Sequence, residues 1–184
     1  MKQVVAYTRT AITLHWLIAL LVFVTFPVGV VMHEMALSPD KLRMLSYHKW
    51  LGVTVFILLV VRLVWRVTHR PAPLSGDMAR WKILAAKAVH ILLYVLLFAI
   101  PLSGWLMSSA KGFQTVYLGV LPLPDLLGKD KVAGDALAAL HEVLNITMLL
   151  LVVAHVAAAL KHQFIERDGT LARMLPFLSR SSSK

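Results

Sequence analysis

Four separate runs of apolar residues, each about 20 residues long or slightly longer, constrain the fold of this 184-residue chain more than any other feature. A helix needs about 20 apolar residues to cross a hydrocarbon layer of about 30 Å, so each run is long enough for one crossing. A bilayer offers no water to the backbone polar groups, so such runs must be helical. The sequence therefore predicts an all-α integral membrane four-helix bundle, one domain over 1–184, with spans at about 10–32, 47–67, 84–107 and 137–160.

The first run has a second interpretation, as a cleaved signal peptide. The apolar core of such a peptide is about 7–15 residues long and is followed by a cleavage site of small residues. The run at 10–32 is longer than that, contains His15 and has no A-x-A ending. We therefore interpret it as the first membrane-spanning helix.

The net charge of +10 follows the predicted topology. Of the 19 Lys and Arg residues, thirteen fall on the side of the membrane that holds both termini and six fall on the other side. The positive-inside rule therefore places both termini of this multi-pass protein in the cytoplasm. A basic surface for nucleic acid is the alternative explanation, but charges sorted by membrane side fail the test of a basic footprint, so we expect no nucleic-acid partner.

Five histidines lie inside the predicted spans, where ionisable side chains are energetically expensive and mark functional candidates. On the fourth span, His141 and His155 are 14 residues apart, which is about 21 Å along a helix and close to four full turns. Both side chains therefore face the same way, one near each membrane surface. In each other span the same offset joins a histidine to a glycine or an arginine: His15 to Gly29, His48 to Arg62 and His90 to Gly104.

Because successive helices alternate in direction, these positions sort into two layers. The outer layer consists of Gly29, His48, Gly104 and His141. The inner layer consists of His15, Arg62, His90 and His155. A hydrogen bond between helices explains a single intramembrane histidine, and close helix packing explains a single glycine, but neither explains the joint pattern. The sequence therefore predicts two stacked cofactor layers.

Haem suits these layers because its iron takes one imidazole from each side of the ring. Glycine lets a helix approach the ring edge closely, since it carries no side chain. Gly52, one turn from His48, adds room on the same face. Arg62 offers a cation to a haem propionate, and Arg9 and Arg66 are further candidates for this role.

The absence of cysteine excludes disulfides, cysteine-ligated iron–sulfur clusters and covalently attached c-type haem. Zinc favours tetrahedral sites with several close ligands, whereas the outer layer offers only His48 and His141. These two histidines are therefore the predicted ligands of the outer haem. In the inner layer His15, His90 and His155 lie at similar depth, so the residues alone leave the inner pair open.

Several motifs together resemble the bacterial cytochrome b561 family, which is related to the cytochrome b subunits of hydrogenases and formate dehydrogenases. The likeness covers nearly the whole chain, and the set of motifs is specific although each piece alone is weak. The matching stretches are TLHWLIAL (13–20), HKWLGV (48–53), VRLVWR (61–66), PLSGWLM (101–107), LHEVLN (140–145), HVAAALKHQF (155–164) and RDGTLARMLP (167–176).

The resemblance implies two non-covalent b-type haems in a bacterial inner-membrane protein. It implies that the second and fourth helices hold one haem, through His48 and His141. It also implies that the first and fourth helices hold the other, through His15 and His155. That leaves His90 for a contact with a propionate or a quinone.

The function expected from these features is electron transfer. An iron with two histidine ligands has no open position, so a substrate can only exchange electrons with it from outside. The resemblance implies a superoxide:ubiquinone oxidoreductase, with superoxide as the donor at the outer side and ubiquinone as the acceptor within the membrane. Lys111 and His90 are the candidate catalytic residues, Lys111 because its cation attracts superoxide. The alternative for Lys111 is a lysine at a helix end that reaches toward the membrane surface.

A second functional hypothesis is a membrane cytochrome b subunit that relays electrons between quinone and a hydrogenase- or dehydrogenase-type partner. An extended docking segment would favour it, and the sequence contains none. A non-redox transporter, the third hypothesis, would need broken helices and repeats.

The connection at 108–136 is too apolar for a free aqueous loop, and we expect it to lie on the outer membrane face or to cover the bundle end.

Overall fold

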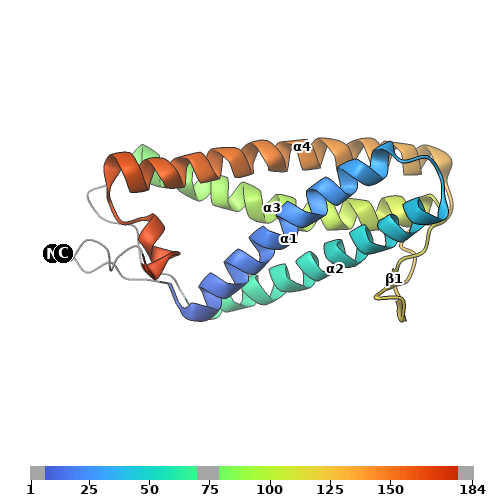
Figure 1. The fold of residues 1–184 in the computed structure, drawn as a ribbon, viewed down its shortest axis with the longest axis horizontal. Coiled ribbons are helices and arrows are strands. Elements are labelled where there is room, and N and C mark those ends of the chain that lie inside the picture. The colour runs from blue at the N-terminus through green and yellow to red at the C-terminus, as the bar shows by residue number, and fades with distance from the viewer. Residues whose placement is uncertain (1–6, 70–78, 178–184) are drawn as a thin grey trace.

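Four long helices make up most of the chain in the computed structural model, which describes residues 7–69 and 79–177. They run side by side along the long axis of the molecule (Figure 1). Each is long and apolar enough to cross a membrane, so the predicted all-α membrane bundle is confirmed. The helices are α1 (Arg9–Glu34), α2 (Pro39–Thr68), α3 (Arg80–Ala110) and α4 (Lys131–Lys161).

The helices begin earlier than the apolar runs do, and at α1, α2 and α4 a polar side chain caps the start of the helix. The side chain of Ser38 accepts a hydrogen bond from the backbone N–H of Lys41 at 3.2 Å, and Pro39 occupies the first turn of α2. The side chain of Asp130 caps α4 in the same way, through the N–H of Ala133 at 3.0 Å. Each predicted span therefore lies within a longer helix.

Few of the apolar side chains on these helices are buried. Only 6% to 11% of the residues in the most apolar stretch of each helix are buried inside the protein. Monomeric soluble proteins rarely expose so large an apolar surface. In a bilayer this surface contacts lipid, so the exposure pattern agrees with a membrane protein.

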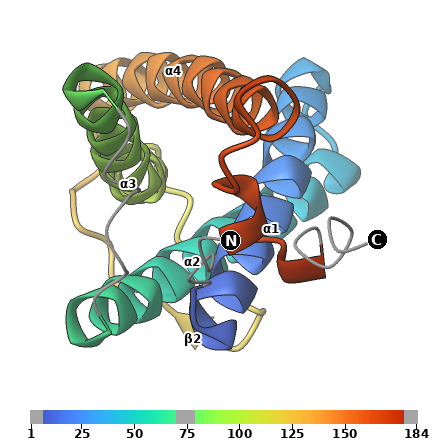
Figure 2. The same ribbon diagram turned by 90° about the vertical axis from the view of Figure 1, so that its left-hand side faces the viewer.

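The helices pack as two hairpins. Close packing occurs between α1 and α2, between α3 and α4, and between α2 and α3. The end-on view shows the four helices arranged around a common axis (Figure 2). The small buried core includes Leu59 of α2, Leu96 of α3 and Met148 of α4, each of which lies along its helix between an outer-layer and an inner-layer position. Apolar packing thus separates the two predicted layers.

The connection between α3 and α4 carries a short antiparallel hairpin of β1 (Val116–Tyr117) and β2 (Leu121–Pro122). It is attached to α2, because the Trp50 indole N–H donates to the carbonyl of Val116 at 2.7 Å. It is also attached to α3, because the Trp105 indole N–H donates to the carbonyl of Pro124 at 3.1 Å. The connection is therefore fixed against α2 and α3 near one end of the bundle.

Beyond α4, the chain folds back across the inner end of the bundle. A π-helical turn (His162–Glu166) and a short 3-10 helix (Leu171–Arg173) follow α4 and lie over the bundle end in Figure 2. The Trp16 indole N–H on α1 donates to the carbonyl of Met174 at 3.1 Å, which fixes this segment against α1. Four of the cations used to predict the orientation lie outside the described residues: Lys2, Arg70, Arg180 and Lys184.

Candidate functional site

The four outer-layer residues come together in the structure. The ring centroids of His48 on α2 and His141 on α4 are 6.3 Å apart, with the ring planes inclined at 82°. A Cβ atom at Gly29 would lie 3.0 Å from Cε1 of His48, and a Cβ atom at Gly104 would lie 3.1 Å from Cε1 of His141. Each glycine therefore makes room for the neighbouring imidazole ring, and the suggested approach of these glycines to a haem edge stays a prediction.

His141 is oriented by α3. Its Nδ1 lies 3.0 Å from the hydroxyl of Ser103 and 3.1 Å from the carbonyl oxygen of Ile100. A carbonyl only accepts, so this pairing assigns the proton to Nδ1 and leaves the lone pair of Nε2 free to bind a metal. The Nδ1 of His48 is buried and has no hydrogen-bond partner within the described residues. Sequence reasoning missed Ser103, although it directly precedes Gly104 in the PLSGWLM motif.

The inner-layer residues also come together. The ring centroids of His15 and His155 are 6.4 Å apart, with the planes inclined at 73°. Those of His90 and His155 are 5.2 Å apart. Arg62 lies beside this group, with its Nη1 atom 3.0 Å from Nδ1 of His15. His90 is held by its own helix, because its Nδ1 contacts the carbonyl of Ala86 at 2.6 Å.

Ring spacing tests whether these pairs fit a haem iron. Two metal–nitrogen bonds of about 2 Å, together with the distance from each nitrogen to its ring centre, separate two axial imidazole centroids by about 6 to 6.5 Å. The pairs His48–His141 and His15–His155 have this spacing. The pair His90–His155 is too close by about 1 Å. The geometry therefore fits one haem in each layer and favours His15 over His90 as the inner ligand.

A different cluster, His162 with Glu166 and Asp168, is the one group of three or more potential metal ligands found in the described parts of the chain. Its carboxylates are already paired: Glu166 lies 2.9 Å from Lys82 and 3.4 Å from Lys161. Partial burial acts to raise the pKa of Asp168, but hydrogen bonds with Thr170 and the contact with His162 outweigh it and hold that pKa below its usual value. We interpret this cluster as an ion-pair network that fixes the turn after α4.

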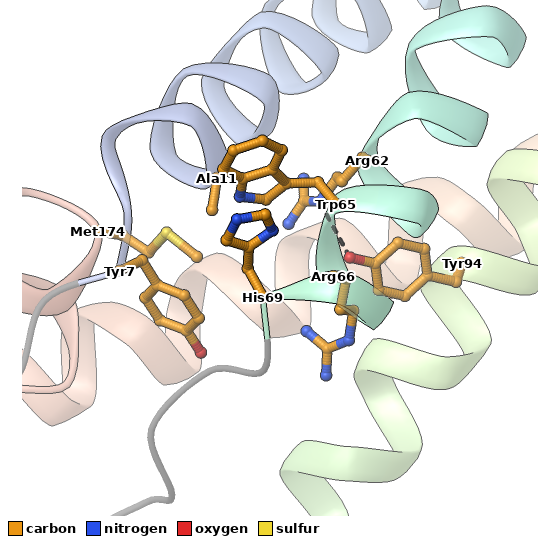
Figure 3. A pocket seen from close by; sticks show the side chains of 8 residues that line it. All are labelled: Tyr7, Ala11, Arg62, Trp65, Arg66, His69, Tyr94 and Met174. Carbon is orange, nitrogen blue, oxygen red and sulfur yellow. Dashed lines mark hydrogen bonds between the residues drawn. The ribbon is translucent and has the colours of Figure 1, made fainter.

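A small cavity of about 30 Å³ adjoins the inner layer, between α1, α2, α3 and the folded-back segment. Trp65 and His69 stack in it with centroids 3.8 Å apart (Figure 3). The hydroxyl of Tyr94 accepts a hydrogen bond from Nε of Arg62 at 2.9 Å, drawn as the dashed line in Figure 3. The lining residues are Tyr7, Ala11, Arg62, Trp65, Arg66, His69, Tyr94 and Met174.

Sequence reasoning missed six of the eight residues that line this cavity, although signals for three of them were present. Tyr94 lies one helical turn beyond His90, Trp65 lies on α2 one turn from Arg62, and His69 is the C-cap residue of α2. A second arginine of the predicted set, Arg66, places its guanidinium 5.6 Å from the Tyr94 ring. The other, Arg9, is exposed at the start of α1.

At the outer end, Lys111 borders an open cavity of about 440 Å³. Its Nζ lies 3.5 Å from a carboxylate oxygen of Asp135, which also pairs with Lys131 at 2.8 Å. Lys129 lines the same cavity, so three ammonium groups face one carboxylate there. A Cβ atom at Gly134 would lie 2.9 Å from Cγ of Lys111. The absence of a side chain at Gly134 therefore leaves room for the side chain of Lys111.

The glycine contacts lead to a first prediction, for Gly104→Ala. The added methyl group would meet His141, which cannot move freely because Ser103 and Ile100 hold its Nδ1. We expect a loss of stability of about 1–3 kcal/mol from overpacking, offset in part by the higher helix propensity of alanine, about 1 kcal/mol. Thermal loss of the haem absorbance measures this effect.

The control for this substitution is Gly128→Ala, because a Cβ atom at Gly128 would meet nothing within 4 Å. That variant should keep the haem content and thermal midpoint of the natural protein. Equal midpoints for both variants would contradict the tight contact at Gly104. A Cβ atom at Gly52 also meets nothing within 4 Å, so the suggested role of that glycine in giving room to a haem stays a prediction.

Known proteins resemble this chain along nearly its whole length. A family model described as prokaryotic cytochrome b561 matches residues 6–177. The chain is 38% identical over 165 residues to "Cytochrome b561 homolog 2" of Escherichia coli (strain K12), covering 88% of this chain and 86% of that protein. It is 28% identical over 179 residues to "Cytochrome b561 homolog 1" of the same organism, covering 92% and 97%. It is 24% identical over 170 residues to "Probable superoxide oxidase CybB" of Yersinia pestis, covering 92% and 96%.

Proposed function

The chain belongs to the prokaryotic cytochrome b561 family, and from this premise we propose that it is a di-haem membrane oxidoreductase that takes electrons from superoxide and gives them to ubiquinone. Membership of the family makes it a membrane electron-transfer protein. The observation that carries the finer proposal is the pair of histidine–histidine spacings, 6.3 Å in the outer layer and 6.4 Å in the inner layer.

His48 and His141 are the proposed ligands of the outer haem, and His15 and His155 those of the inner haem. A haem held by each pair would supply one-electron transfer. The protein holds the imidazoles in place, and the carbonyl of Ile100 assigns the proton of His141 to Nδ1. Arg62 supplies a positive charge beside the inner pair.

The outer cavity is the proposed entrance for superoxide. Lys111, Lys129 and Lys131 outweigh the single carboxylate of Asp135 there, so the cavity attracts a small anion. Each superoxide loses one electron and leaves as O₂, so two superoxide anions supply the two electrons that one quinone needs. The similarity to a protein named as a probable superoxide oxidase supports this choice of donor.

The inner cavity is the proposed site of quinone reduction. Its wall combines an aromatic stack with groups that donate hydrogen bonds to quinone oxygens: Arg62, Arg66, His69 and Tyr94. At about 30 Å³ the cavity holds little more than water, so the quinone ring enters only when side chains such as Met174 move aside. Ubiquinone takes two electrons and two protons there to form ubiquinol. The charge distribution supports a cytoplasmic location for this end, in a bacterial inner membrane.

A stopped-flow experiment tests the reaction and gives a second prediction. Superoxide mixed with the purified, oxidised protein should reduce the haems at or above about 10⁵ M⁻¹s⁻¹, the low end for unsteered encounter. Added ubiquinone should reoxidise them without a partner protein. Lys111→Glu should slow the reduction by about tenfold at low salt, because it replaces an attracting charge with a repelling one. The difference should shrink at high salt, which screens exposed charges.

Arg43→Glu is the matched control. It makes the same change of charge on the outer side, at an exposed residue that does not line the cavity. Reduction far slower than the stated limit would favour the membrane cytochrome b subunit with a hydrogenase- or dehydrogenase-type partner. Fast reduction of the haems that Lys111→Glu and Arg43→Glu slow equally would support the reaction with superoxide. It would refute the outer cavity as the entrance for superoxide.

A further inference from the structure

The two layers differ in the charge that surrounds their histidines. In the outer layer, the Nδ1 of His141 contacts only neutral groups, the Ser103 hydroxyl and the Ile100 carbonyl. In the inner layer, the Nδ1 of His15 contacts the guanidinium of Arg62 at 3.0 Å. Arginine stays protonated in proteins, so this charge is permanent.

Arg62 is held in the inner layer by α3, because Nδ1 of His15 can accept its hydrogen bond only while Nε2 carries the proton of that ring. Its Nε donates to the hydroxyl of Tyr94 at 2.9 Å, and its guanidinium carbon lies 5.5 Å from the centre of the Tyr94 ring. Arg66 lies over the same ring at 5.6 Å and adds a second positive charge. Tyr94 therefore anchors the Arg62 charge independently of which nitrogen of His15 carries a proton.

The cations near the outer layer are directed elsewhere. Lys49 follows His48 in the sequence, but its ammonium group donates to the carbonyl of Phe113 in the outer connection at 2.7 Å. Lys111 pairs with Asp135. Within residues 7–69 and 79–177, no hydrogen bond or ion pair joins a cation to His48 or His141. The asymmetry of charge between the layers is thus a property of the fold.

We propose that Arg62, anchored by Tyr94, raises the reduction potential of the inner haem above that of the outer haem, so that the fold itself directs electrons from the outer face to the inner face. Reduction adds one negative charge to a haem centre, and a fixed cation in a low-dielectric interior stabilises the reduced form. In the outer layer the hydrogen bond from His141 to a carbonyl strengthens the imidazole as a donor and stabilises the oxidised form. This inference rests on the proposed di-haem function and adds a direction to it.

Redox titration of the purified, haem-loaded protein tests the proposal without an activity assay. The His48→Ala variant, which should retain only the inner haem, identifies which spectral component belongs to it. In the natural protein, the inner haem should have the higher potential. Arg62→Gln should shift the electron equilibrium between the two haems about tenfold toward the outer haem, which for one electron equals about 59 mV. Arg62→Lys, which keeps the charge, should recover most of this shift.

A second variant covers the case in which Arg62→Gln fails to retain the inner haem. Tyr94→Phe removes the hydroxyl that anchors Arg62 but leaves the charge, so it should shift the same equilibrium in the same direction by about threefold, or about 28 mV. The proposal is overturned by an outer haem with the higher potential, by an unchanged inner potential in Arg62→Gln, or by an unchanged one in Tyr94→Phe.

The proposed function can fail separately. A protein that carries two haems with these potentials but does not react with superoxide or ubiquinone would refute the proposed reaction and support the electron direction. A protein that carries fewer than two haems would refute both.

Discussion

Replacing either His48 or His141 with alanine is expected to remove one and the same haem and to leave the other in place. The two rings face each other at 6.3 Å, so each substitution takes away one of the two nitrogens that an outer iron needs. Haem content measured as the pyridine haemochrome should fall from two per chain to one. The remaining haem should keep the low-spin spectrum of a centre with two histidine ligands.

The inner layer gives the matching half of this prediction. His15→Ala and His155→Ala should each remove the other haem, because their rings have the spacing of an axial pair. His90→Ala is the internal control, since His90 is an inner-layer histidine whose ring is too close to His155 for an iron to lie between them. Loss of the inner haem in His90→Ala, with normal spectra in His15→Ala, would show that the inner pair is assigned wrongly.

The depth of each functional residue could be predicted from sequence, whereas its lateral neighbours could not. An offset of 14 residues fixes height and facing on a helix, and the structure brings the outer-layer residues into contact accordingly. Depth alone could not separate His15 from His90 as a partner of His155. That distinction depends on how far apart the helices stand, which is set by packing between segments distant in the sequence.

The same limit explains which residues of the site were missed. Ser103 and Tyr94 act through partners on other helices, His141 and Arg62, and no local pattern in the sequence indicates those contacts. The pairing of Lys111 with Asp135 is similar, because the two residues lie on either side of the outer connection. The starts of the helices could not be predicted from the apolar runs, since apolar content does not mark the polar caps at Ser38 and Asp130.

Closing the inner cavity should separate the two halves of the reaction. Ala11 lines this cavity, so Ala11→Trp would place a large ring in the space that a quinone has to enter. The histidine pairs are not altered, so superoxide should still reduce both haems at the natural rate. Reoxidation by ubiquinone should slow by at least about tenfold, which corresponds to about 1.4 kcal/mol in the barrier.

Leu20→Trp is the control for added bulk on the same helix, because Leu20 is 60% exposed on the lipid-facing surface and does not line the cavity. Stopped-flow reoxidation of the pre-reduced protein by a soluble ubiquinone measures both variants under the same conditions. Normal reoxidation in Ala11→Trp would move quinone reduction away from this cavity. Slow reoxidation in Ala11→Trp, with normal reoxidation in Leu20→Trp, would mean that electrons leave beside Arg62 and Tyr94. The reason is that only the cavity next to Arg62 and Tyr94 has been filled, while electrons still enter normally at the outer face.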